Sequence, residues 1–350
     1  MTRLRSIFLL AALAYTAASG AEIEGGGKTA PLFASNDVLE VTISAPFKQI
    51  MRERSDTEDM PGTLTFQDPE AGETTLDIGI RTRGRFRRQA EICPFAPLRL
   101  NFSKTKSTVF AKSKKLKLVT HCRSGAPPYT QALLKEYIAY RILNTLTDQS
   151  FRVRLLHVNY IENTTRKVVD TNYAILIEHR NQLAKRIGME VSKAETTVVS
   201  ALDSRHTNIS SVFQYLIGNT DFSPIKAPPG EPCCHNYVLM RHDERKMLSI
   251  PYDFDNTGIV SAPHAAPNPR FGLRNIEQRL YRGRCANNSH LDSTLQLFRD
   301  KRQAIYDLLK SVPDLKNSSI RKIARYLDDF YKTIDSPKHV QRQLVDKCLK

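Results

Sequence analysis

The sequence predicts an α+β protein of two lobes: a β-rich first half with one long helix, and a mainly helical second half with one hairpin. Three observations support this. Apolar and polar residues alternate in five segments before residue 122, apolar residues recur at helical spacing over 129–147, and helical spacing returns at 294–312 and 318–334. The chain has 350 residues, of which 41% are hydrophobic, enough for two lobes that share an interface.

The N-terminus predicts export. Arg3 and Arg5 precede an apolar run over 7–14, and small residues at 19–21 form a peptidase site, so we interpret residues 1–21 as a signal peptide. The run is too short to cross a bilayer of about 30 Å, and no later apolar run reaches the length of a membrane span. We therefore expect a periplasmic or extracellular protein without a transmembrane segment. Residues 22–36, rich in Gly and Ala, are expected to form a flexible lead-in.

Residues 37–180 form the predicted β-rich lobe. Apolar alternation between Pro, Gly and Asp clusters indicates an antiparallel sheet with strands at 38–45, 62–66, 74–84, 97–102 and 115–121. The long helix at 129–147 follows, and segments 151–162 and 171–179 would extend the sheet as a hairpin-like pair.

Residues 181–350 form the predicted helical lobe. A short helix begins near Ile209 and stops at Gly218, and a Pro-rich loop then runs to Cys234. A strand, a polar turn and a second strand follow, ending at the sequence "PYDFD", and helices occupy 294–312 and 318–334.

Six cysteines in an exported chain favour disulfides over a metal site, and no CxxC or HxxxH spacing is present. Cys93 and Cys122 flank two predicted strands of one sheet, so we expect them to pair. We also expect Cys233 or Cys234 to pair with Cys285.

The chain is strongly basic, with 52 Lys and Arg against 36 Asp and Glu and a formal net charge of +16. This balance attracts phosphates, polyanions or an acidic surface, and it equally fits a well-solvated basic exterior. The basic residues form no single stripe and the chain has no Trp for base stacking, so we do not expect a nucleic-acid partner.

Polar oxygen-bearing side chains end three segments of the second half. "GNTD" ends at Asp221, "CHN" at Asn236, and "PYDFD" supplies Asp253 and Asp255. Such oxygens suit Mg²⁺, which commonly binds one or two carboxylates plus substrate phosphates. Taken alone, each residue is better explained as a turn residue, but their combination favours a function.

The order of these residues along the chain favours phosphoryl transfer. That reaction uses a helical Glu that orients a Lys, a carboxylate base, and an Asn and an Asp on the metal. Glu136, Asp221, Asn236 and Asp253 occur in this order. No GxSxG element suggests hydrolase chemistry.

The sequences "LLKEYIAYRILNTLTDQSFRVRLLHVNYI", "IGNTD", "HNYVLM" and "IPYDFDNTG" resemble the exported, spore coat protein H-like (CotH) branch of atypical kinases. "GNTD", "HN" and "PYDFD" are also similar to the catalytic segment of HipA-type kinases. The resemblance covers roughly residues 75 to 335. It implies a two-lobed protein-kinase-like fold with a catalytic hairpin, and ATP with Mg²⁺ or Mn²⁺ between the lobes.

The resemblance also implies roles for single residues. Asp221 would be the catalytic base, Asn236 and Asp253 would bind the metal, and Asp255 would support them or bind a second metal. Glu136 would pair with a strand lysine. We name Lys117 for that role and leave Lys115, on the same strand face, and Arg99 as alternatives.

The chain departs from the kinase pattern in two places. No GxGxxG loop is present, and the nearest substitute is the turn around Gly84, where Arg83, Arg85 and Arg87 either hold phosphate or form an exposed basic hairpin. The segment between Asp221 and Asn236 is also longer than a standard catalytic loop.

Three functions follow from these observations. One is an exported, ATP- and metal-dependent phosphotransferase acting on a hydroxyl of a protein or cell-envelope molecule. The alternative is an inactive kinase-fold protein that binds a nucleotide, a polyanion or an envelope partner. A basic binding module without a nucleotide site is the third possibility.

Overall fold

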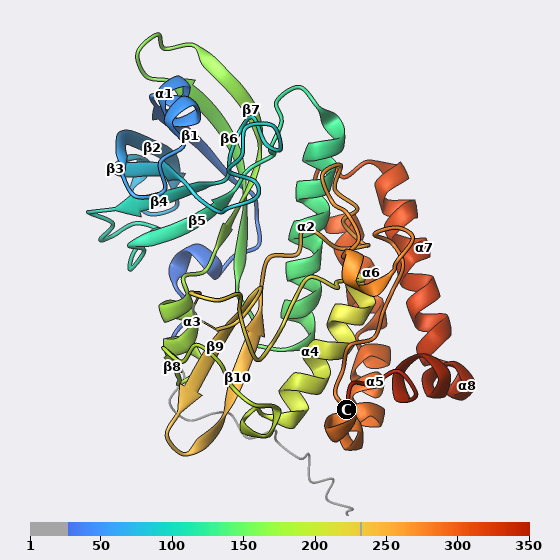
Figure 1. The fold of residues 1–350 in the computed structure, drawn as a ribbon. Coiled ribbons are helices and arrows are strands. Elements are labelled where there is room, and N and C mark those ends of the chain that lie inside the picture. The colour runs from blue at the N-terminus through green and yellow to red at the C-terminus, as the bar shows by residue number, and fades with distance from the viewer. Residues whose placement is uncertain (1–26, 232) are drawn as a thin grey trace, which may run out of the picture.

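The computed structural model describes residues 27–231 and 233–350. The expected signal peptide and the first part of the lead-in, residues 22–26, lie outside the described residues. The α+β class and the division into a β-rich first half and a helical second half are confirmed (Figure 1). Among the described residues, none of the helices has the length and apolar character needed to cross a membrane.

The β-rich region is a closed barrel whose strands follow the order β1-β2-β3-β4-β5-β7-β6. Alternate residues of each strand, among them Ile43, Leu64 and Leu100, fill its interior. The strands are β1 (Leu39–Ala45), β2 (Met60–Asp68), β3 (Gly72–Thr82), β4 (Leu98–Phe102), β5 (Lys115–Val119), β6 (Val153–Glu162) and β7 (Val168–Ile177).

The sheet differs from the expected one because it closes. β1 pairs antiparallel with β2 and parallel with β6, with Leu39 opposite Leu156. Closure satisfies both edges of the sheet, which an open sheet leaves unpaired. The expected hairpin-like pair is confirmed, because β6 and β7 are antiparallel neighbours.

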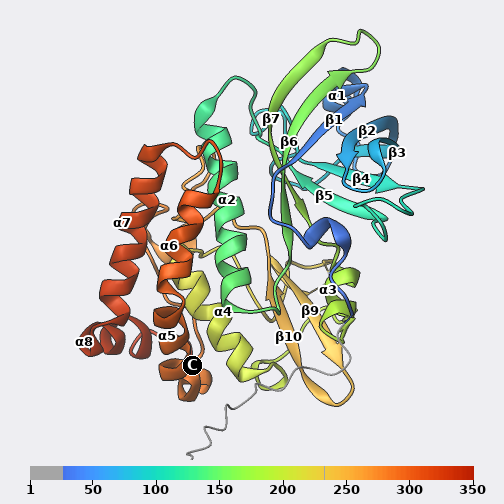
Figure 2. The ribbon, with the colours of Figure 1, turned by 180° about the vertical axis from the view of Figure 1, so that it is seen from behind.

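Helix α2 (Pro127–Leu146) lies between the barrel and the helices of the second half, and two opposite views agree on this (Figures 1 and 2). Every residue from Gln131 to Tyr140 is buried, so the helix is enclosed on all sides. It therefore belongs to the large core that also contains α4 and α7 side chains such as Phe213 and Phe330.

The second half contains the predicted hairpin. β9 (Tyr237–His242) and β10 (Arg245–Pro251) are antiparallel, and β8 (Glu190–Val191) pairs with the free edge of β9. The remaining helices are α1 (Phe47–Glu53), α3 (Arg180–Arg186), α4 (Ser204–Ile217), α5 (Leu291–Asp300), α6 (Arg302–Ser311), α7 (Asn317–Ile334) and α8 (Pro337–Val340), with a π-helical turn at Gln341–Val345.

Three expectations need correction. Ala30, Leu32 and Phe33, inside the expected lead-in, are buried in the barrel core. The single helix expected over 294–312 is two helices, α5 and α6, which meet at Lys301.

The disulfides are the third case. The pair Cys93–Cys122 is confirmed. The expected bond from Cys233 or Cys234 to Cys285 is wrong, because Cys233 and Cys234 bond to one another. Cys285 bonds instead to Cys348 and fixes the C-terminal segment, where the Cys285 N–H also donates to the Leu349 carbonyl.

Candidate functional site

A cavity of about 750 Å³ gathers most of the predicted site residues. Its walls come from the loop after β3, the hairpin, the segment after α4 and residues 264–269. The predicted residues that line it are Arg83, Asp221, Asn236, Asp253 and Asp255.

The hairpin places Asn236 and Asp253 side by side. Asn236 directly precedes β9, Asp253 follows β10, and the Tyr252 N–H donates to the Asn236 carbonyl at 3.0 Å. Both residues have left-handed backbones, with φ of 55° and 66°. Non-glycine residues rarely adopt this conformation, and it concentrates at functional sites.

Asp221 reaches the same place through a turn after α4. Gly218 ends that helix with φ of 67°, and the Gly258 N–H donates to its carbonyl at 3.2 Å. A residue with a side chain would not fit at position 258, since a Cβ there would lie 2.9 Å from the Ile276 carbonyl oxygen. The turn before Asp221 and the segment after Asp255 are thus held together.

The Asp221 carboxylate is held by its two neighbours across the cavity. His235 Nε2 lies 2.8 Å from Oδ1, and this hydrogen bond raises the pKa of His235. Asn236 Nδ2 donates to the Asp221 carbonyl at 2.6 Å and to Oδ2 at 3.3 Å. Arg282 donates to the carbonyls of Thr220 and Phe222 and so fixes the peptide on either side of Asp221.

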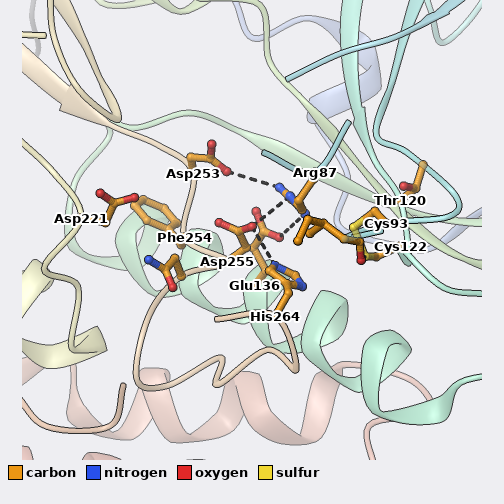
Figure 3. A network of polar contacts seen from close by, with 12 residues as sticks. Arg87, Cys93, Thr120, Cys122, Glu136, Asp221, Asp253, Phe254, Asp255 and His264 are labelled. Carbon is orange, nitrogen blue, oxygen red and sulfur yellow. Dashed lines mark hydrogen bonds and ion pairs between the residues drawn. A yellow bond between two sulfur atoms is a disulfide. The ribbon is translucent and has the colours of Figure 1, made fainter. Parts of the chain in front are cut away.

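Arg87 also lines the cavity, and its guanidinium lies among three carboxyl groups (Figure 3). Its Nε is 2.9 Å from Asp255 Oδ2, its Nη2 is 3.4 Å from Asp253 Oδ1, and its Nη1 is 3.8 Å from Glu136 Oε2. The predicted pairing of Glu136 with a strand lysine is therefore wrong. An arginine from the loop after β3 takes that place.

Burial and charge together set the ionisation of this network. Burial alone would lower the pKa of Arg87, but Asp255, Glu136 and Asp253 raise it, so the guanidinium stays charged. Burial raises the pKa of Glu136 to about 8. Burial would raise the pKa of Asp255 as well, but Arg87 and then His264 hold it well below its usual range.

Lys117 lies on the outer face of the barrel and points toward the hairpin. Its Nζ is 4.0 Å from the centre of the Tyr252 ring, which lines the cavity. Burial, then the charge of Arg83, lowers the pKa of Lys117 to about 7. Of its two alternatives, Lys115 is exposed and Arg99 lies directly opposite Lys117 on β4.

The three arginines of the turn near Gly84 all line the cavity, but their contacts differ. Arg83 forms no ion pair among the described residues, Arg85 forms an exposed ion pair with Glu231 of the Pro-rich segment, and Arg87 is buried among the carboxylates. The sequence allowed two interpretations of this turn, a phosphate-binding loop and an exposed basic hairpin. Neither interpretation describes all three arginines.

Two side-chain oxygens at the cavity suit a divalent cation as ligands. Within the residues described, Asp253 Oδ2 and Asn236 Oδ1 accept no hydrogen bond, and both side chains line the cavity. These are hard oxygens of the kind Mg²⁺ prefers, with phosphates and water to complete the shell. Asp255 instead bonds Arg87 and His264, so it supports the site rather than facing the same position.

In the part of the chain that is described, one group of three His, Cys, Asp or Glu side chains has ligand atoms close enough together to hold a metal ion. It consists of Cys93, Cys122 and His264. The two cysteines are bonded to each other, so they offer no thiolate.

Sequence reasoning missed several positioning residues. Tyr140 Oη accepts the Asp253 N–H at 2.8 Å, and His264 Nε2 lies 3.2 Å from Asp255 Oδ2. Tyr140 carried a usable signal, because it lies four residues after Glu136 and thus on the same helix face. His264 and Arg282 had no local pattern that would have identified them.

Comparison with known proteins adds no assignment: neither a family model nor a curated protein matches this chain.

Proposed function

We propose that this chain is an exported kinase-like phosphotransferase. It would use ATP with Mg²⁺ or Mn²⁺ to phosphorylate a hydroxyl of a protein or cell-envelope molecule. The observation that carries the proposal is the joining of Asp221 to Asn236, with Asp253 beside them at the same end of the hairpin and all three on one cavity. The barrel, α2 and the hairpin support a two-lobed protein-kinase-like fold of the spore coat protein H-like type.

Asp221 is suited to act as the base. Its carboxylate lines the cavity, and His235 and Asn236 fix its orientation, so it is placed to accept the proton of an acceptor hydroxyl. Asn236 and Asp253 would hold the metal, which neutralises charge on the phosphates when bound. Arg83 and Lys117 would contact the phosphates from the barrel side.

Export is supported by the disulfides. All six cysteines are bonded, and such bonds persist in oxidising compartments. We infer that the acceptor is met in the periplasm or outside the cell.

Transfer of labelled phosphate from ATP to casein, to cell-envelope extracts and to the protein itself tests the function. Asp221→Asn should lower the rate by about 10²–10⁴-fold, and Asp253→Ala should abolish metal-dependent transfer. Asp243→Ala is the control, since Asp243 lies in the turn at the opposite end of the hairpin and is exposed. Transfer that is unchanged by Asp221→Asn and Asp253→Ala contradicts the proposal.

The alternative, a nucleotide- or polyanion-binding protein without catalysis, draws on one observation. Arg87 already supplies a cation to Asp253 and Asp255. ATP binding with no transfer to any acceptor, and no effect of Mn²⁺ on that binding, would favour this alternative.

A further inference from the structure

Three basic residues lie directly opposite one another across neighbouring strands. Arg81 on β3 faces Arg99 on β4, and Arg99 faces Lys117 on β5. The residues on either side of Arg99 and Lys117 are buried leucines of the barrel core, so the basic side chains stand on the outer face. Like charges at directly opposed positions destabilise a sheet.

Among the described residues, only one end of this row is neutralised. Arg81 bonds Asp59 at 2.7 Å. Across residues 27–231 and 233–350, Arg99 and Lys117 form no ion pair and no side-chain hydrogen bond, and the same is true of Arg83 and Arg180. These four cations, Arg83, Arg99, Lys117 and Arg180, are called the basic cluster below.

The members of the basic cluster are close enough to repel one another. Burial, followed by the charges of Arg81, Arg83 and Arg180, lowers the pKa of Arg99. The same positive charges act on the neighbouring His179. Burial and then Arg180, Arg99 and Lys117 lower the pKa of His179 to about 4. The protein therefore concentrates positive charge here at a cost to its own stability.

The basic cluster borders the candidate active site. Arg83 and Arg180 line the 750 Å³ cavity, and the Tyr252 ring beneath Lys117 lines it as well. Asp253, one residue beyond Tyr252, lines the same cavity, and its charge offsets part of the lowering of the Lys117 pKa that burial and Arg83 cause. An anion bound by the cluster would thus extend toward Asp253 and Asn236.

We propose that Arg83, Arg99, Lys117 and Arg180 form a subsite for a chain of linked phosphates, which takes the place of a glycine-rich loop. The guanidinium groups of Arg83, Arg99 and Arg180 suit this ligand, because each can bind phosphate oxygens in a bidentate manner. The proposal rests on the proposed function in naming the phosphate chain of a nucleotide as the occupant. The subsite itself requires neither a base nor catalysis, so it binds an inorganic phosphate chain too.

Calorimetry with inorganic tripolyphosphate tests the subsite, at pH 6 and without nucleotide or metal. We expect the full-length protein to bind tripolyphosphate more tightly than orthophosphate, and Arg99→Gln and Arg180→Gln each to weaken that binding about 10-fold. Arg325→Gln is the matched control, since it removes one exposed arginine from α7, far from the cluster in sequence, and should leave binding unchanged.

A stability measurement separates binding from a structural role. Removing one of several mutually repelling cations should leave the melting temperature of Arg99→Gln unchanged or raised while binding falls. A lowered melting temperature with unchanged tripolyphosphate binding overturns the proposal, as does equal binding by all variants or none by the parent protein.

The outcomes also separate the two proposals. Tripolyphosphate binding that depends on Arg99 and Arg180, in a protein that transfers no phosphate, supports the subsite and contradicts the phosphotransferase. Phosphate transfer from ATP without cluster-dependent binding of tripolyphosphate does the reverse.

Discussion

Arg87 Nε lies 2.9 Å from Asp255 Oδ2, and this contact joins the loop after β3 to the segment after β10. The same guanidinium reaches Glu136 on α2 and Asp253. A single buried cation therefore connects the barrel, the central helix and the hairpin end that carries the proposed metal ligands.

Replacing Arg87 should destabilise the protein severely. Arg87→Met leaves the Asp253 and Asp255 carboxylates without their cation, and removing one partner of a buried ion pair costs about 3–5 kcal/mol. Urea unfolding at pH 7 measures the change. Arg88→Met is the control: Arg88 pairs with Asp56 near the surface, where such a pair contributes about 0–1 kcal/mol. Equal losses from the two variants would contradict the account of the network.

Tyr140→Phe should weaken metal binding with little loss of stability. The Tyr140 hydroxyl accepts the Asp253 N–H at 2.8 Å and so fixes the backbone of a proposed ligand. The lost hydrogen bond costs about 1 kcal/mol. Titration of Mn²⁺ followed by electron paramagnetic resonance measures the affinity. Tyr137→Phe on the same helix, whose hydroxyl accepts from Arg141, should bind Mn²⁺ like the parent; an equal effect of both variants counts against the role of Tyr140.

The affinity for ATP should carry a pH dependence from Lys117. Its pKa of about 7 means that the amine loses its charge as pH rises from 6 to 8. Phosphates bind the charged amine better, so this contribution to affinity is present below pH 7 and declines above it. Bound phosphate raises the pKa of Lys117 and moves the decline to higher pH.

Lys117→Arg isolates that contribution because an arginine stays charged throughout this range. Isothermal titration at pH 6, 7 and 8 should show the dissociation constant of the parent rising relative to that of Lys117→Arg, by up to about 10-fold. A constant ratio would mean that Lys117 does not contact the phosphates.

The disulfide Cys285–Cys348 should stabilise the helical region. The bond closes a loop with a sequence separation of 63, for which chain entropy predicts about 4 kcal/mol. The double variant Cys285→Ser/Cys348→Ser should therefore unfold at lower denaturant. Cys233→Ser/Cys234→Ser is the control, because adjacent residues close almost no loop. A larger loss from the control than from the long-range pair would contradict this estimate.

The sequence predicted elements whose signal is local. Alternation in "TTLDIGIRT" and helical spacing over 129–147 both correspond to observed elements, and Gly218 ends α4 as expected. Barrel closure could not be predicted, because the parallel pairing of β1 with β6 joins segments more than a hundred residues apart. Short α1 and α3 carry too few residues to show a period.

The site was predictable where chain order and hairpin geometry decide position. Asn236 and Asp253 flank the two strands of one hairpin, so a correct hairpin brings them together. The partner of Glu136 was not predictable in this way. Arg87 comes from an irregular loop, and alternation along β5 says which face Lys117 occupies but not which carboxylate it meets.

The central claim is that Asp221, Asn236 and Asp253 form one nucleotide and metal site. Anomalous diffraction from crystals grown with Mn²⁺ and a non-hydrolysable ATP analogue tests it most directly. We expect a manganese peak within about 2.0–2.6 Å of oxygens from Asn236 and Asp253, with the phosphates between it and the basic cluster. A nucleotide bound elsewhere, or a manganese peak away from both residues, would contradict the claim.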